Sequence, residues 1–253
     1  GVGTGPGEFQ RTGKMLIQND TLMVSDHRSW QISKFDTDGK FIKVKKYTDY
    51  TKAAWIPKKF GIKYVSEFNG SVVEEGIKYR IKGISLFDEN LDHVKDIYMN
   101  KIESSPGKRA VGAVFSTSDN DLFISVNSKD EYKIDVYDLE GNKTRVIRKN
   151  YSKIKFSDEY IQKQEERNEK RGTNNLTIFK TSVYRLDSDK YGRLWVRSAK
   201  KNKEEGWKFD IFENDIFLKR IYLNIDKEYI PFLVRDKLIT VNYDKNIIKI
   251  YDY

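Results

Sequence analysis

The chain has 253 residues, of which 38% are hydrophobic, and 47 lysines and arginines against 38 acidic residues give it a formal net charge of +9. A chain of this size can bury a substantial core, and the absence of cysteine excludes disulfides and thiolate metal sites. The charge favours anionic partners but also suits an ordinary soluble surface, and no apolar run reaches the length of a membrane span.

The composition favours an all-β fold. Sixteen tyrosines, 14 phenylalanines and four tryptophans, against three methionines and four prolines, are typical of pleated, half-buried strands. In the first repeat, apolar residues alternate with period two and predict four short antiparallel strands joined by tight turns. The expected strands are Met15–Gln18, Leu22–Ser25, Trp30–Phe35 and Lys40–Tyr47.

Two motifs frame this repeat. Gly5-Pro6-Gly7-Glu8-Phe9 precedes the first strand, and Phe35-Asp36 with Gly39-Lys40-Phe41 ends the third strand and opens the fourth. With the strands between them, these motifs resemble an NHL repeat and the bacterial six-bladed propellers loosely called TolB-like. The resemblance implies a six-bladed β-propeller of four-stranded antiparallel blades, located in the periplasm or at the cell surface. Relatives of this kind bind proteins or RNA, and some are metal-dependent lyases or hydrolases.

An aromatic residue followed by an acid marks the end of the third strand in each of five repeats. These pairs are Phe35-Asp36, Phe87-Asp88, Tyr137-Asp138, Phe212-Glu213 and Tyr251-Asp252. The strands expected in the second repeat are Ile62–Phe68, Ser71–Glu74, Tyr79–Phe87 and Asp92–Met99, with Asn69-Gly70 as the tight turn of a hairpin. The third and fourth repeats have four strands each, and the fifth has three. Their expected bounds are Val111–Ser116, Leu122–Val126, Tyr132–Tyr137, Lys143–Arg148, Ser182–Leu186, Arg193–Ser198, Trp207–Phe212, Ile216–Leu223, Ile230–Val234, Leu238–Val241 and Ile247–Asp252.

The long spacing between the third and fourth markers leaves room for an insertion. Ser157 can cap a helix whose first turn is acidic, and Gly172 can end it. We therefore predict a helix within about 157–172, lying over the propeller with Tyr160 and Ile161 inward. The chain is otherwise expected to be one domain over residues 1–253. The fifth repeat lacks an outer strand, which is expected upstream of Gly1.

The lengths of the connections point to one face of the propeller. The links 48–60, 100–110 and 149–180 between successive repeats are long, and long loops on a rigid scaffold commonly carry binding sites. Together with the last link they carry a formal charge of about +6, and basic groups among aromatic ones suit phosphate contacts with base or sugar stacking. The expected ligand-binding residues are His27, Arg28, Tyr50, Trp55, Lys58, Lys59, Lys200 and Lys201.

Two alternatives accompany this interpretation. Trp55 can instead wedge between blades, and lysines on outer strands can serve only to discourage edge-to-edge pairing. If the face binds a ligand, Trp55 is expected to stack on it and Lys58 to contribute to its salt dependence.

The chain offers little material for catalysis. His27 and His93 are its two histidines, and His93 is expected on an outer strand in contact with solvent. The segment Asp187–Gly192 begins like a calcium loop but lacks later ligands, so a turn between strands explains it better. We predict no catalytic residue, metal or cofactor. The expected function is a non-enzymatic binding scaffold for a protein or glycan partner. The alternatives are single-stranded RNA or another polyanion at the same face, and a metal-dependent lyase or hydrolase.

Overall fold

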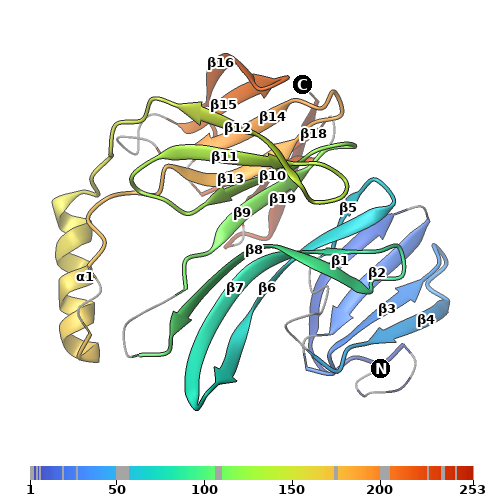
Figure 1. The fold of residues 1–253 in the computed structure, drawn as a ribbon. Coiled ribbons are helices and arrows are strands. Elements are labelled where there is room, and N and C mark those ends of the chain that lie inside the picture. Colours follow the sequence, from blue (N-terminus) through green and yellow to red (C-terminus); the bar gives the residue numbers. More distant parts are fainter. Residues whose placement is uncertain are drawn as a thin grey trace. The chain divides into compact units, whose positions relative to one another are not determined.

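The structure of the chain is a computed structural model, which describes residues 3, 5, 7–18, 20–26, 28–49, 57–105, 110–173, 176–199, 206–226, 228–234, 237–242 and 244–252. The chain divides into two compact units, Gly1–Gly112 and Ala113–Tyr253. Within the described residues it forms five antiparallel sheets and a single helix (Figure 1). In each sheet, neighbouring strands are consecutive in the sequence, as in the blades of a β-propeller. The fold is therefore an all-β propeller built mainly from four-stranded blades.

Unit 1 contains two four-stranded sheets. The first follows the order β1-β2-β3-β4, and its strands match those expected for the first repeat. The second has the order β5-β6-β7-β8. The bounds are β1 Thr12–Gln18, β2 Thr21–Asp26, β3 Gln31–Phe35, β4 Phe41–Lys46, β5 Lys58–Phe60, β6 Lys63–Glu74, β7 Ile77–Phe87 and β8 His93–Glu103.

The second sheet corrects the predicted hairpin. Asn69 and Gly70 lie within β6, opposite Lys82 and Ile81 of β7. The tight turn is Glu75-Gly76 instead, where both residues have positive φ angles of 50° and 79°. The segment Ile62–Phe68, which was expected to form the first strand of this repeat, therefore belongs mainly to the second strand, β6. The first strand is the short β5.

The two sheets of unit 1 share an apolar core. Met23 and Ile32 of the first sheet pack with Tyr64, Phe87 and Leu91 of the second, and all five side chains are buried. Polar contacts close the same interface: the Tyr47 hydroxyl donates to the Leu91 carbonyl at 3.2 Å, and Lys45 pairs with Asp92. His93 packs edge-on against Phe87 and pairs with Asp96 at 2.8 Å, so it is more constrained than the solvent-facing histidine that was predicted.

Asp26, at the end of β2, is a buried carboxylate that gathers backbone donors. Its oxygens accept the amides of Gln10 at 2.6 Å, Arg11 at 3.1 Å, Arg28 at 2.9 Å and Ser29 at 3.3 Å. Burial alone would raise the pKa of Asp26, but the hydrogen bonds from Gln10, Ser29 and Arg28 outweigh it and lower the pKa to about 2. Asp26 therefore holds the segment before β1 and the β2–β3 loop in place.

Unit 2 contains two four-stranded sheets and one three-stranded sheet, in the orders β12-β11-β10-β9, β13-β14-β15-β16 and β17-β18-β19. All three match the predicted repeats, and β19 forms an edge of the last sheet. The first strands of the sheets lie side by side, since β13 contacts both β9 and β17. The bounds are β9 Ala113–Thr117, β10 Leu122–Val126, β11 Tyr132–Tyr137, β12 Lys143–Lys149, β13 Val183–Ser188, β14 Leu194–Ser198, β15 Trp207–Glu213, β16 Ile216–Leu223, β17 Ile230–Val234, β18 Lys237–Asn242 and β19 Ile247–Asp252.

Two apolar cores hold the sheets of unit 2 together. Between the β9–β12 and β13–β16 sheets, Phe123 and Ile134 pack with Leu186 and Val196 among others. Between the β13–β16 and β17–β19 sheets, the core includes Trp195, Phe209, Ile211 and Leu233. Alternating strand residues thus supply both faces of the middle sheet, as period two requires.

A buried ion cluster reinforces the first of these interfaces. Asp210 of β15 is fully buried and accepts from Lys149 Nζ of β12 at 3.0 Å and from Arg220 Nε of β16 at 2.7 Å. Ser198 Oγ lies 3.4 Å from its other oxygen. Burial acts to raise the pKa of Asp210, but Arg220 and Lys149 lower it below its usual value.

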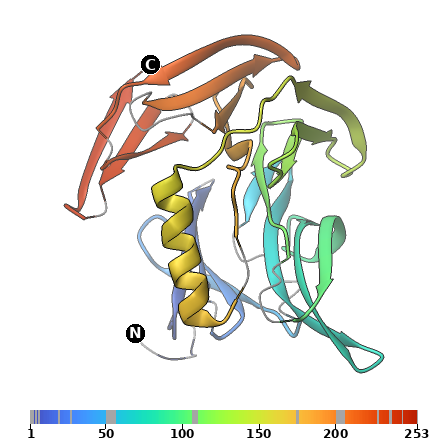
Figure 2. The same cartoon turned by 90° about the vertical axis from the view of Figure 1, so that its left-hand side faces the viewer.

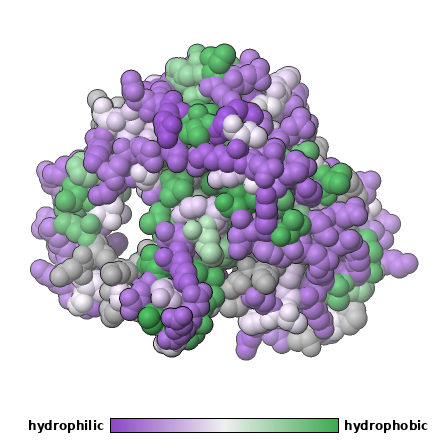
Figure 3. Space-filling view, in the orientation of Figure 1, coloured by the Kyte–Doolittle hydropathy of each residue, from purple (hydrophilic) through white to green (hydrophobic). Residues whose placement is uncertain are grey.

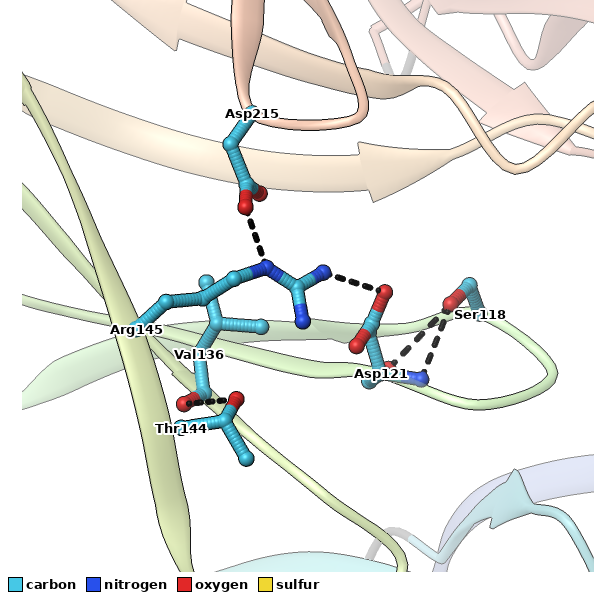
Figure 4. Close-up of polar contacts among 6 residues, drawn as sticks. All are labelled: Ser118, Asp121, Val136, Thr144, Arg145 and Asp215. Carbon is cyan, nitrogen blue, oxygen red and sulfur yellow. Dashed lines mark hydrogen bonds and ion pairs between the residues drawn. The ribbon is translucent and has the colours of Figure 1, made fainter.

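A second contact across this interface lies nearer the surface. Arg145 of β12 donates to Asp121 at 2.8 Å and also pairs with Asp215, in the β15–β16 turn (Figure 4). Asp121 is itself fixed, because its amide donates to the Ser118 hydroxyl at 3.1 Å. Arg145 therefore connects two sheets through two loops.

Among the described residues, four turns between strands share one geometry. In each, an aspartate carboxylate accepts the amides two and four residues later, and the third residue after it has a positive φ angle. This confirms the interpretation of Asp187–Gly192 as a turn, in which Asp189 accepts from Tyr191 and Arg193. In the other three turns the aspartates are Asp36, Asp88 and Asp138. The left-handed residue is glycine in three turns and Leu91, with a φ of 63°, in the fourth.

Two edge strands of unit 2, β16 and β19, carry exposed apolar side chains. Ile216 and Leu218 of β16 are 67% and 46% exposed, and Figure 3 shows hydrophobic side chains at the top of the view over this strand. Ile248 and Ile250 of β19 are similarly exposed.

The insertion forms the predicted helix. α1 spans Asp158–Arg171, with Ser157 accepting the Tyr160 amide at its start and Gly172 in the left-handed conformation at its end. It has no buried residue, so it does not cover the sheets as predicted: Tyr160 stacks on Phe156 and is 45% exposed. Figures 1 and 2 show α1 at the end of two extended segments, away from the sheets of its own unit. No helix in the described part of the chain is long and apolar enough to span a membrane.

Deleting residues 157–172 should leave a cooperatively folded protein. The helix contributes no buried side chain, and the two segments that carry it pair with each other through Phe156 and Ile178, and through Lys180 and Ile154. The expected result is lower helical ellipticity in circular dichroism with a single thermal transition close to that of the intact chain. Global loss of structure on deletion would show that the insertion is needed for folding.

Candidate ligand-binding site

The structure describes three of the eight residues expected to bind a ligand. Arg28 is exposed in the β2–β3 loop, as predicted, and its amide is tied to Asp26. Lys58 and Lys59 lie in β5 opposite Val65 and Tyr64, and not in the link before it. The other five fall outside the described residues: His27, Tyr50, Trp55, Lys200 and Lys201.

Lys58 borders a cavity in unit 1. The cavity has a volume of about 240 Å³ and lies along the first sheet at its junction with β5. Its walls are mainly apolar, with Ser25 and Lys58 as the polar members. The lining residues are Met15, Leu16, Met23, Ser25, Ile32, Pro57 and Lys58.

A second concentration of basic and aromatic groups lies in unit 2. Arg185 of β13 and Arg197 of β14 are directly opposite each other in the antiparallel pair. The register shifts beside them because Tyr184 is an extra residue in β13, which makes a β-bulge. Trp207, at the start of β15, lies next to Arg197. We refer to Tyr184, Arg185, Arg197 and Trp207 as the paired-arginine site.

Arg185 is held from two sides. Its Nε donates to both carboxylate oxygens of Asp187, at 2.9 and 2.7 Å, which is the natural partner two residues along the same strand face. Its guanidinium lies 4.5 Å from the centre of the Phe232 ring of β17. The charge of Arg185 is therefore largely balanced by Asp187.

Arg197 is placed differently. Its guanidinium lies 5.1 Å from the Trp207 ring centre, and among the described residues no carboxylate forms an ion pair with it. Burial, together with the charge of Arg185, lowers the pKa of Arg197 below its usual value, although Asp187 and Tyr184 act in the opposite direction. Two like charges opposite each other on a sheet are unfavourable, so the folded protein keeps this cation at a cost.

One tyrosine, Tyr184, lies beside Arg185 at the β-bulge. Tyr184 is 39% exposed, and its partial burial, together with Tyr151 and Tyr160, raises the pKa of its phenol. Tyr151 donates its hydroxyl to the Lys180 carbonyl at 3.4 Å, and Tyr160 belongs to α1. Tyr151 and Tyr160 both belong to the segment between β12 and β13.

The backbone around the site is firmly connected. The Ala199 amide donates to the Ser182 carbonyl at 3.1 Å, and Ser182 donates its own amide and hydroxyl to Ser128 and Glu131 of the neighbouring sheet. In the sequence, Lys200 and Lys201 follow Ala199 directly. The two predicted lysines are therefore close to Arg197 along the chain.

A cationic pair among aromatic rings can receive an anionic group. The guanidinium plane offers donors in a fixed fork that matches a carboxylate or phosphate, and the rings offer flat apolar surfaces. Neither Arg185 nor Arg197 is among the residues that the sequence predicts to bind a ligand. The available signal was one arginine in each of two strands that were expected to pair.

No family model matches the chain, and no curated protein matches it. Solved structures with a similar course of the chain include a member of the DUF4221 family from Bacteroides vulgatus, with 13% identity and a TM-score of 0.49 over 99% of this chain and 81% of that one. BamB from Moraxella catarrhalis is 10% identical, with a TM-score of 0.39 over 94% of this chain and 69% of that one. AztD from Citrobacter koseri is 11% identical, with a TM-score of 0.38 over 96% of this chain and 58% of that one. Similarity at this level assigns no function.

Proposed function

We propose that the protein is a non-enzymatic binding scaffold that receives an acidic group of a protein or glycan partner at the paired-arginine site. The resemblance of the first repeat to NHL repeats supports two further parts of the proposal: the fold is a six-bladed propeller, and the protein acts in the periplasm or at the cell surface. Its supporting observation is a cation, Arg197, that is partly buried opposite another cation.

This observation favours binding over an ordinary soluble surface. Lysines and arginines on an ordinary surface are usually solvated and lie apart. Burying a cation, or placing two cations opposite each other on a sheet, destabilises the folded state. Arg185 and Arg197 lie directly opposite each other on strands, next to a β-bulge, and such bulges often reorient side chains at functional sites. A bound anion would balance the second charge.

Single-stranded RNA is the second candidate, because Trp207 and Tyr184 could stack on bases while the arginines contact phosphates. A strand of RNA would release several counterions, so its affinity would fall steeply with salt. A single acidic group would give a much shallower dependence. The salt dependence of binding therefore separates these two partners.

Changing Arg197 to Gln should weaken binding of an anionic partner by about tenfold or more, as expected for a lost charged hydrogen bond. Labelled polyglutamate, polygalacturonate and polyuridylate serve as probes, with affinity measured by fluorescence anisotropy. Arg148→Gln is the matched control, since Arg148 is an exposed arginine on β12 of the same unit. Equal weakening by both variants would mean that the probes respond only to net charge, and would contradict the proposal.

A further inference from the structure

The net charge of the paired-arginine site is balanced by a ligand group that carries one negative charge. Asp187 is buried and pairs with Arg185 through two short contacts, so Arg197 is the cation left for a ligand among the described residues of the site. A phosphate dianion in this position would also meet the carboxylate of Asp187. A carboxylate brings one charge and balances Arg197.

The guanidinium of Arg197 suits a carboxylate as well. It lies 5.1 Å from the centre of the Trp207 ring, and a cation over a ring contacts it without using its N–H donors. Two parallel N–H donors match the two oxygens of a carboxylate. Lysine in the same place would supply charge without this fork.

The surroundings favour a ligand that is rich in hydroxyl groups. Tyr184 is the extra residue of the β-bulge, directly before Arg185. Its phenol can donate and accept a hydrogen bond, and its ring presents a flat apolar face. A pyranose ring has the complementary surfaces: an apolar face of C–H groups and a rim of hydroxyls.

Resting on the proposed function, we infer that the paired-arginine site binds a uronic acid residue of an acidic glycan. The carboxylate of the sugar pairs with Arg197, its ring lies against the Tyr184 ring, and one of its hydroxyls bonds the Tyr184 hydroxyl. Acidic peptides share the carboxylate but lack the hydroxyl-bearing ring, and RNA carries phosphates along its length.

The test compares trigalacturonate with its methyl ester by isothermal titration calorimetry on the full chain. Esterification removes the negative charges and leaves the rings and their hydroxyls, so the ester should bind at least about tenfold more weakly. Arg197→Gln and Arg197→Lys should each lose a similar factor for trigalacturonate, because the first removes the charge and the second removes the fork. Tyr184→Ala should weaken binding by several fold, while Arg148→Gln should leave it unchanged.

Folding of the variants is followed by thermal unfolding. Arg197→Gln removes a cation that burial and Arg185 disfavour, so its unfolding midpoint should equal or exceed that of the unchanged protein. A loss of binding in this variant cannot then be attributed to unfolding.

The outcomes separate the inference from the proposed function. If tetraglutamate or octauridylate binds in an Arg197-dependent way and trigalacturonate does not, the inference fails and the scaffold function stands. If trigalacturonate and its ester bind equally, or if Tyr184→Ala has no effect, the uronic acid assignment fails. If no probe depends on Arg197, both fail.

Discussion

Replacing Asp210 with Ala should lower the free energy of unfolding by about 3–5 kcal/mol, the range found when one partner of a buried ion pair is removed. Asp210 is fully buried and is shared by Lys149 and Arg220 from two different sheets. Without it, Lys149 and Arg220, whose side chains are only partly exposed, lose their shared carboxylate and are left close to each other. Urea denaturation of the full chain, followed by tryptophan fluorescence, measures the loss.

Asp130→Ala is the matched control for this experiment. Asp130 pairs with Lys153 at 2.6 Å, but its side chain is 58% exposed, and exposed pairs contribute little to stability. Its removal should leave the denaturation midpoint nearly unchanged. If Asp210→Ala has an equally small effect, the cluster is not a structural element of the unit 2 interface.

Acidification should destabilise unit 1 through Asp26. Its folded-state pKa of about 2 is below the ordinary value of 3.8, so the ionised form contributes stability above about pH 4, and this contribution is lost as the pH falls towards 2. The difference corresponds to about 2 kcal/mol. Asp26→Asn should cost a similar amount at neutral pH and should remove this part of the acid dependence, measured by urea denaturation between pH 2 and 7.

Asp36→Asn makes the same substitution at a solvent-facing turn. The Asp36 carboxylate accepts two backbone amides, which water can also satisfy, whereas Asp26 accepts four in a buried place. The Asp36 variant should therefore be clearly more stable than the Asp26 variant at neutral pH. Equal losses would mean that burial of Asp26 adds nothing to its hydrogen bonds.

Most of the architecture could be predicted because each strand has its own apolar period. The aromatic–acid markers have a direct physical explanation in three sheets. The aromatic residue ends the third strand, and the aspartate carboxylate fixes the turn by accepting two amides. At Phe212-Glu213 the same marker precedes a different turn, in which Asn214 and Asp215 both have positive φ angles.

The second repeat was mispredicted because two dipeptides compete for one turn. Asn-Gly is the stronger local signal, but a turn at Asn69-Gly70 would shorten the long β6–β7 hairpin. The observed turn at Glu75-Gly76 keeps Tyr64 opposite Phe87, and both of these aromatic residues lie in the core of unit 1. Tertiary packing therefore decides the register, and the sequence shows this only when both sheets are considered.

The paired-arginine site was beyond sequence reasoning for a related reason. Strand prediction placed Arg185 and Arg197 on neighbouring strands, but the bulge at Tyr184 decides that they are directly opposite each other. A bulge inserts one residue and changes which side chains share a face. The exposed position of α1 was similarly unpredictable, because its caps define its ends and say nothing about what it packs against.

The turn at Leu91 shows how a local geometry adapts to its neighbour. Three of the four aspartate turns place glycine at the left-handed position, where a side chain costs about 1 kcal/mol or more. Leu91 adopts the same conformation with its side chain fully buried against the first sheet, and burial of a leucine gains about 1.5–3 kcal/mol. At the third position after the aspartate, a large apolar residue therefore indicates a turn that packs against another sheet. A glycine here would relax the backbone and leave a hole between the sheets, so the strained leucine is the more stable choice for this turn alone.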